Sequence, residues 1–192
     1  TITPANLSIT GTKTYDGTAQ FNAGALSVTG LIGSDAIGTA TALSQNVIDN
    51  GSNYFTNFTL STGIAANYQL ASAGVNNDAQ ITPANLSITG TKTYDGTTNF
   101  ATSTLATAGA VNGETITLTA GNGTTTSANA ATYAGSTLTG LVMSVSGGNA
   151  LASNYALPGT GDLTITPANL SITGTKTYDG TTNFATSTLA TA

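Results

Sequence analysis

Apolar and polar residues alternate with a period of two along several short stretches of the chain. Leu7 and Ile9 stand between polar neighbours, and Ile116 and Leu118 stand between threonines. Two further stretches alternate in the same way, with apolar positions at Tyr54, Phe58 and Leu60, and at Leu141, Met143 and Val145. A period of two puts one set of side chains on one face of a β-strand. The pattern predicts an all-β protein of short antiparallel strands, each burying one face.

Tight turns are expected between these strands where an Asn or Asp precedes a glycine. Such pairs supply the positive φ angles that tight hairpins require. They occur at Asp16-Gly17, Asn50-Gly51, Asn112-Gly113 and Asn122-Gly123. We expect the chain to reverse direction at each of them.

The stretch ITPANLSITGTKTYDGT occurs three times without substitution, at residues 2–18, 81–97 and 165–181. Solenoid repeats recur every 20–50 residues or so, whereas these copies begin 79 and 84 residues apart. That spacing is typical of small independent modules that follow one another along an elongated rod. The expected division is the end of one module, two whole modules and the start of another, at residues 1–3, 4–82, 83–166 and 167–192.

A proline stands between two strand-like segments in every copy, at Pro4, Pro83 and Pro167. Proline cannot donate a ladder hydrogen bond, it fixes its own φ, and it keeps the preceding residue extended. The last strand of one module is therefore expected to run through a short, stiff joint into the first strand of the next.

The second half of the stretch, TKTYDGT, contains one lysine in each copy, and these three are all the lysines of the chain. Its tyrosine is expected to pack its ring while the hydroxyl finds a hydrogen-bond partner, and its Asp-Gly pair to bend the chain. The motif residues are Tyr15, Asp16, Gly17, Tyr94, Asp95, Gly96, Tyr178, Asp179 and Gly180.

These motifs, followed later by NYQL at 67–70 and NYAL at 154–157, resemble a known family. They are similar to the YDG-type repeat, related to the MBG repeat, of large bacterial adhesins and filamentous-haemagglutinin-like exoproteins. The resemblance implies a secreted or cell-surface protein of a Gram-negative bacterium, whose repeats build a stalk or fibre. It implies an immunoglobulin-like sandwich or a β-grasp-like sheet for each module, and it supplies no catalytic residue.

Composition removes several classes of function. The chain has no His and no Cys, which leaves nucleophilic hydrolysis without its usual base and structural zinc without its usual ligands. We therefore expect no enzyme activity and no cofactor. Eight acidic residues against three lysines give a net charge of −5, so no basic patch invites a nucleic acid. No run of eighteen apolar residues exists, so no membrane insertion is expected in this segment.

Three kinds of modified or metal-bound site stay open from the sequence. Calcium could bind at the joints between Asp78 and Asp95, or between Asp162 and Asp179. The lysine of a module could form a covalent bond to an Asn or Asp, assisted by the acid at the aligned positions Asp35 and Glu114. Glycosylation could occur at the Asn-x-Ser/Thr sites of Asn6, Asn57, Asn85, Asn122 and Asn169.

The leading functional expectation is a non-catalytic stalk, spacer or fibre repeat in cell adhesion or a biofilm matrix, with neighbouring identical repeats as its partners. One alternative is a module that binds host or matrix glycans or mucins through Tyr54, Phe55, Tyr133 and Tyr155. Another is a filament subunit that pairs with itself through exposed strand edges.

Overall fold

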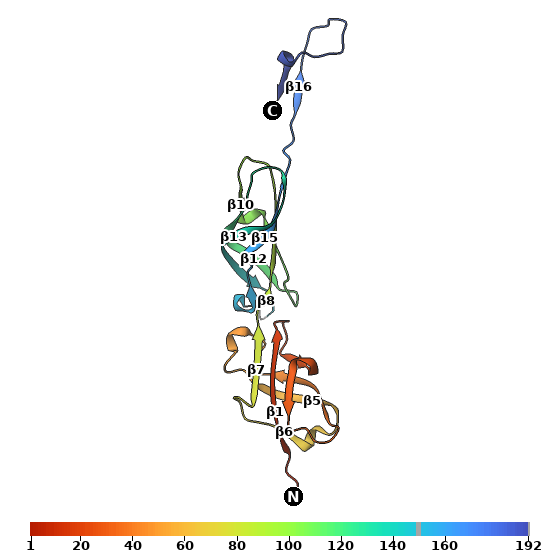
Figure 1. The fold of residues 1–192 in the computed structure, drawn as a ribbon, viewed down its shortest axis with the longest axis vertical. Coiled ribbons are helices and arrows are strands. Elements are labelled where there is room, and N and C mark those ends of the chain that lie inside the picture. The colour runs from red at the N-terminus through yellow and green to blue at the C-terminus, as the bar shows by residue number, and fades with distance from the viewer. Residues whose placement is uncertain (149–150, 192) are drawn as a thin grey trace.

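The computed structural model describes residues 1–148 and 151–191. Residues 149–150 of the predicted second module and Ala192 at the end of the range 167–192 therefore lie outside the described residues. All strand pairs of the described residues fall within three ranges, 5–82, 84–166 and 172–191. We name the first two ranges the first and second units. Figure 1 draws them one after the other along its vertical axis, with the last hairpin beyond them.

The first unit consists of β1 (Ala5–Thr14), β2 (Gln20–Asn22), β3 (Leu26–Thr29), β4 (Ala36–Ala42), β5 (Phe55–Thr62), β6 (Tyr68–Leu70) and β7 (Asn77–Thr82). The second consists of β8 (Ala84–Asn85), β9 (Ser87–Thr93), β10 (Asn99–Ala101), β11 (Leu105–Ala108), β12 (Thr115–Thr124), β13 (Ala131–Ser146), β14 (Tyr155–Ala156) and β15 (Thr160–Thr166). The last hairpin pairs β16 (Ile172–Gly174) with β17 (Leu189–Thr191).

Helical structure in the described residues is limited to single 3-10 turns of three residues each. They are η1 (Ala23–Ala25), η2 (Val47–Asp49), η3 (Ala65–Asn67), η4 (Thr102–Thr104), η5 (Ala152–Asn154) and η6 (Thr186–Thr188). The prediction of an all-β chain is confirmed. None of the helices in residues 1–148 and 151–191 has the length and apolar character needed to cross a membrane.

The first unit buries its core between two sheets. In one sheet β1 lies between β3 and β6 and also pairs with β7, and the other has the order β2-β4-β5. Alternation along β1 turns Leu7 and Ile9 inward, as the sequence predicts, and both are fully buried. Phe21 and Phe55 meet edge to face between the sheets, with ring centroids 5.0 Å apart.

The expectation of antiparallel strands alone is wrong. β1 pairs in parallel with β7 from Ile9↔Asn77 to Thr14↔Thr82, and β9 pairs in the same way with β15. The first and last strands of a unit can run in the same direction because the rest of the unit forms the long crossover that a parallel pair needs. As a result, the chain enters each unit at one end and leaves it at the other.

The last strand of each unit is hydrogen-bonded along its second edge in a different way. In the first unit the side-chain amide of Asn50 donates to Ile81 O at 2.8 Å and accepts from Ile81 N at 3.0 Å. In the second unit Ala131 of β13 pairs by its backbone with Ile165 of β15. This pairing joins β13 to β15, so that the second unit has one six-stranded sheet, β10-β12-β13-β15-β9-β11. The backbone of Ile81 in the first unit is thus bonded by the side chain of Asn50, whereas the backbone of Ile165 in the second unit is bonded by the strand β13.

Three of the four predicted turns occur at positive-φ glycines, namely Gly17, Gly51 and Gly113. The fourth prediction is wrong, because Asn122 and Gly123 lie inside β12 and pair with β13. A Cβ atom at Gly123 would lie 2.7 Å from Leu163 Cδ1. Gly123 therefore gives room to a core leucine rather than turning the chain.

At the joint between the units a strand stands on each side of the proline, as the sequence predicts. β7 ends at Thr82, Pro83 follows, and β8 begins at Ala84. After β15 the chain passes Pro167 and enters β16 only at Ile172.

Candidate functional site

The lysine of the repeated stretch ties together the loop that follows it. Lys13 Nζ donates to Asp16 Oδ1 at 2.6 Å, to Thr18 O at 2.7 Å, to Thr18 Oγ1 at 3.0 Å and to Gln20 O at 2.8 Å. The ammonium also lies 5.0 Å from the ring centroid of Phe21. Thr18 donates its N–H back to Asp16 Oδ1 at 2.9 Å. The Asp-Gly bend is therefore held by a largely buried cation at its centre.

All three copies build this loop alike. Lys92 donates to Asp95, Thr97 and Asn99 at 2.7–2.9 Å, and Lys176 donates to Asp179, Thr181 and Asn183 at 2.7–2.9 Å. The hydrogen bond from Lys92 lowers the pKa of Asp95 to about 2, and the one from Lys176 lowers the pKa of Asp179. In each case the lysine binds residues of its own copy and the backbone carbonyl of the second residue after it.

The tyrosine of the first copy, by contrast, reaches into the second unit. Tyr15 Oη donates to Glu114 Oε1 at 2.6 Å, and Tyr155 Oη donates to Glu114 Oε2 at 2.6 Å. Val111 N donates to Tyr155 Oη at 3.1 Å. The two tyrosine rings meet edge to face at 5.5 Å. We call Val111, Glu114 and Tyr155 the acceptor site of the second unit.

The acceptor site holds Tyr15 as a neutral phenol. Burial, followed by the hydrogen bond to Glu114, raises the pKa of Tyr15 to about 12. The same two causes raise the pKa of Tyr155. A carboxylate that accepts two phenolic hydroxyls has both oxygens satisfied, which offsets the cost of burying its charge.

Further contacts widen this junction between the units. The fully buried amide of Asn154 accepts from Val47 N at 2.9 Å and donates to Asn46 Oδ1 at 3.0 Å. One continuous cluster of buried apolar side chains includes Tyr15 of the first unit and Leu86 and Tyr155 of the second. The two units therefore share a core across the Pro83 joint.

The later copies of the tyrosine have no such environment. Tyr15 is 2% exposed, whereas Tyr94 is 47% and Tyr178 is 92% exposed. The expectation that the motif tyrosine packs its ring and finds a partner is therefore confirmed for the first copy alone. The exposure of this tyrosine differs between three identical segments. In the described residues only Tyr15 packs against the acceptor site of the unit that follows it.

The first unit carries a matching acceptor site at its other end. Tyr68 Oη donates to Asp35 Oδ2 at 2.7 Å and accepts from Ile32 N at 3.1 Å. The hydrogen bond to Asp35 raises the pKa of Tyr68. A cavity of about 510 Å³ adjoins these side chains. We call Ile32, Asp35 and Tyr68 the open acceptor site.

Two of the alternative sites are not assembled. The lysines bond within their own loops, while Glu114 bonds to tyrosines and Asp35 to Tyr68, so the structure does not bring lysine and aligned acid together. Among residues 1–148 and 151–191, no three His, Cys, Asp or Glu side chains gather as a metal site would need. Of the proposed calcium ligands, Asp95 and Asp179 are paired with lysines.

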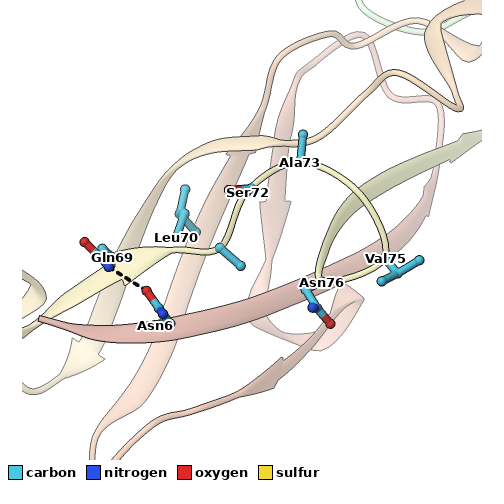
Figure 2. A pocket seen from close by; sticks show the side chains of 8 residues that line it. Asn6, Gln69, Leu70, Ser72, Ala73, Val75 and Asn76 are labelled. Atoms are coloured by element: carbon cyan, nitrogen blue, oxygen red, sulfur yellow. Dashed lines mark hydrogen bonds between the residues drawn. The ribbon is translucent and has the colours of Figure 1, made fainter.

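The residues expected to stack on a glycan divide into two groups. Phe55 and Tyr155 lie in the buried core, where they cannot reach a ligand, while Tyr54 and Tyr133 are half-buried. A groove of about 620 Å³ lies beside β6. Gln69 Nε2 donates to Asn6 Oδ1 at 2.6 Å at its edge, and Figure 2 draws the side chains that line it. Its lining holds neither an aromatic nor a charged side chain. The groove therefore lacks the stacking platform of a sugar site.

The Asn-x-Ser/Thr sites differ in access. Asn122 is half-buried in β12 and accepts a hydrogen bond from Thr139. The other four are exposed, at Asn6, Asn57, Asn85 and Asn169.

Sequence reasoning missed the two contacts that define the site. In every copy the Asp stands three positions after the Lys, and this spacing is the only local pattern in the sequence that could have predicted the ion pair. Glu114 is the single Glu of the chain and aligns with Asp35. No local pattern marks Glu114 as the partner of a tyrosine 99 residues away.

Comparison with known proteins identifies a family. A model of the YDG domain matches residues 1–75 and again residues 77–164. No curated protein and no solved structure matches the chain. Because the two matches together span most of the sequence, the protein belongs to the YDG domain family.

Proposed function

We propose that the chain is a non-catalytic structural repeat of a secreted bacterial adhesin. Its units would follow one another as a stiff rod that serves as a stalk, a spacer or part of a fibre. In this role the protein lies at the surface of a Gram-negative cell, in cell adhesion or in a biofilm matrix. Each unit would be a small immunoglobulin-like or β-grasp-like module.

The observation that carries the proposal is the packed junction. Tyr15 of the first unit is buried against Glu114 and Tyr155 of the second, and the buried apolar cluster continues across Pro83. A flexible linker would leave these groups in water. A junction with its own core and a buried carboxylate resists bending, which is what a spacer needs.

The repeated stretch supports the same role. Each copy supplies a proline joint, a first strand and a lysine-tied loop that needs no other unit. An array built from such units can lengthen by duplication, because every new unit brings one tyrosine loop and one acceptor site. Adhesion, biofilm and surface location rest on the resemblance described above.

Glycan binding has less support. Two of its four candidate side chains are buried, and the groove beside β6 has no aromatic lining. A glycan array probed with the full chain tests this alternative directly. Binding that Tyr54→Ala or Tyr133→Ala abolishes would favour it over a purely structural role.

Small-angle X-ray scattering, extrapolated to zero concentration, tests the stalk. We expect the distance distribution of one elongated particle, with a long tail from the two units in line. The double variant Tyr15→Ala, Glu114→Ala removes the buried junction contact and should broaden that distribution. A wild-type profile that only a mixture of bent and straight shapes can fit would overturn the proposal.

A further inference from the structure

The turn that carries Glu114 touches the loop of Tyr15 at a second point. Glu114 N donates to Val111 O at 2.9 Å and closes a turn that contains Asn112. Asn112 Nδ2 lies 3.5 Å from Gly17 O. Tyr15 and Gly17 stand two positions apart in their loop, and their partners in the turn are also two positions apart. One turn of the second unit therefore meets one loop of the first unit at two places.

Gly17 meets Asn112 with no room for a side chain. A Cβ atom at Gly17 would lie 2.5 Å from Asn112 Cβ and 2.9 Å from Asn112 Nδ2. Carbon atoms in contact prefer a separation of about 3.5–4.0 Å, so a methyl group at this position would overlap Asn112. Rotation of the Asn112 side chain cannot relieve the overlap, because Cβ is fixed to the backbone. The junction therefore needs a glycine at position 17.

The second copy separates this need from the demands of the turn. Gly96 has a φ of 78°, against 77° at Gly17. An alanine is strained by a positive φ at either place. In the described residues a Cβ atom at Gly96 would meet nothing within 4 Å. The collision with the neighbouring unit is therefore specific to Gly17.

The turn itself does not require an asparagine. Gly33 of the first unit stands at the position aligned with Asn112, just as Asp35 aligns with Glu114. Asp35 N donates to Ile32 O at 3.3 Å and closes the corresponding turn. The φ angles are 65° at Gly33 and 52° at Asn112, so both residues lie in the left-handed region. The backbone of this turn accepts either residue, which leaves the side chain of Asn112 to act on the loop.

We propose that the acceptor site of the second unit selects the loop it binds by the glycine of Tyr-Asp-Gly, and that Asn112 enforces the selection. Glu114 binds the tyrosine hydroxyl, while Asn112 Cβ occupies the space that a side chain at the third position of the motif would need. A site can discriminate through such a clash as well as through attraction. The inference rests on the proposed structural role and names the motif that one unit presents to the next.

A double-mutant cycle tests the proposal by urea denaturation of the full chain. Gly17→Ala should raise the equilibrium constant of unfolding at least about tenfold more than Gly96→Ala does, which is the effect of overpacking a filled contact. In the Asn112→Gly background this excess should disappear, because the opposing Cβ is gone. Asn112→Ala keeps Cβ without the amide and should leave the excess in place.

Three results of this cycle would overturn the inference. The first is an equal loss in Gly17→Ala and Gly96→Ala. The second is an excess that survives Asn112→Gly, and the third is a rescue by Asn112→Ala as complete as that by Asn112→Gly. Strain at the positive φ is common to both glycines and cancels in the comparison.

Nuclear Overhauser contacts between aromatic rings report on the junction itself. The rings of Tyr15 and Tyr155 lie 5.5 Å apart across the junction, and those of Phe21 and Phe55 lie 5.0 Å apart inside the first unit. Gly17→Ala should weaken the first contact and keep the second, and adding Asn112→Gly should restore the first. A tyrosine contact that Gly17→Ala leaves at full strength would also overturn the inference. The stalk proposal is tested separately, because it depends on the scattering of wild type, which does not enter this cycle.

Discussion

The first two copies of TKTYDGT have one sequence and two environments. Their lysines hold the loop through the same four bonds, at 2.6–3.0 Å in the first copy and 2.7–2.9 Å in the second. Their tyrosines differ, since Tyr15 is buried against the next unit and Tyr94 is half exposed. The lysine part of the motif therefore belongs to each loop, and the tyrosine part acts only when an acceptor site follows. The same motif therefore supplies a lysine that holds its own loop and a tyrosine that contacts the neighbouring unit.

The largest expected contrast is between the two tyrosines. Tyr15→Ala should lower the free energy of unfolding by about 3–5 kcal/mol, because it removes a buried aromatic ring and its bond to Glu114. Tyr94→Ala should change it by less than about 0.5 kcal/mol, as an exposed substitution does. Urea denaturation of both variants measures the difference. Equal effects would contradict the view that the environment alone distinguishes them.

The lysines should show no such contrast. Lys13→Met and Lys92→Met each keep the apolar stem but remove the ammonium from two backbone carbonyls and a carboxylate. Each should cost about 1.5–3 kcal/mol, the range for hydrogen bonds that involve a charged group. Urea denaturation compares the pair, and Lys176→Met serves as a control outside both units. A much larger loss for Lys13 than for Lys92 would mean that the lysine too depends on the junction.

The closure of the first unit by Asn50 offers a smaller effect. Asn50→Ala removes both hydrogen bonds to Ile81 and should cost about 1–2 kcal/mol. Ala131→Ser changes the corresponding place in the second unit, where backbone pairing does the work, and should cost less than about 0.5 kcal/mol. Hydrogen exchange at the Ile81 amide reports the change locally. Unaltered protection of that amide in Asn50→Ala would show that the side chain does not close the sheet.

The pH dependence of the junction should be the smallest effect near neutrality and should grow in alkali. The pKa of Tyr15 is raised from 10.0 to about 12. A raised tyrosine pKa contributes stability that is complete below pH 10 and is lost as the pH rises through 12. Urea midpoints measured across this window should fall less steeply in Tyr15→Phe than in wild type. Tyr94→Phe should keep the wild-type slope, and an equal change in both variants would refute the assignment.

Strand-forming stretches and the proline joint could be predicted because local rules govern them. Leu7 and Ile9 lie in the core as their alternation requires, and Pro83 separates two strands. The same local rules failed at Gly123. A glycine after Asn predicts a turn. Gly123 instead lies within a strand, where the side chain of Leu163 leaves no room for a Cβ atom.

The functional contacts lay beyond local rules for a different reason. The bond from Tyr15 to Glu114 joins residues 99 positions apart, and the sequence around Tyr15 is identical to that around Tyr94. No pattern within either segment can therefore tell the buried tyrosine from the exposed one. The parallel pairing of β1 with β7 was missed in the same way, because alternation reveals a strand's faces but not its partner's direction.

That parallel pairing has a mechanical consequence. When the chain is pulled from both ends, force enters a unit at the start of β1 and leaves at the end of β7, two parallel strands that are hydrogen-bonded side by side. The load drags them in opposite directions along their length, so the hydrogen bonds between them share it instead of opening one by one. We predict that each unit unfolds in single-molecule pulling as one event at high force. Gradual yielding at low force would contradict that prediction, and a tether under flow would benefit from the shear-loaded arrangement.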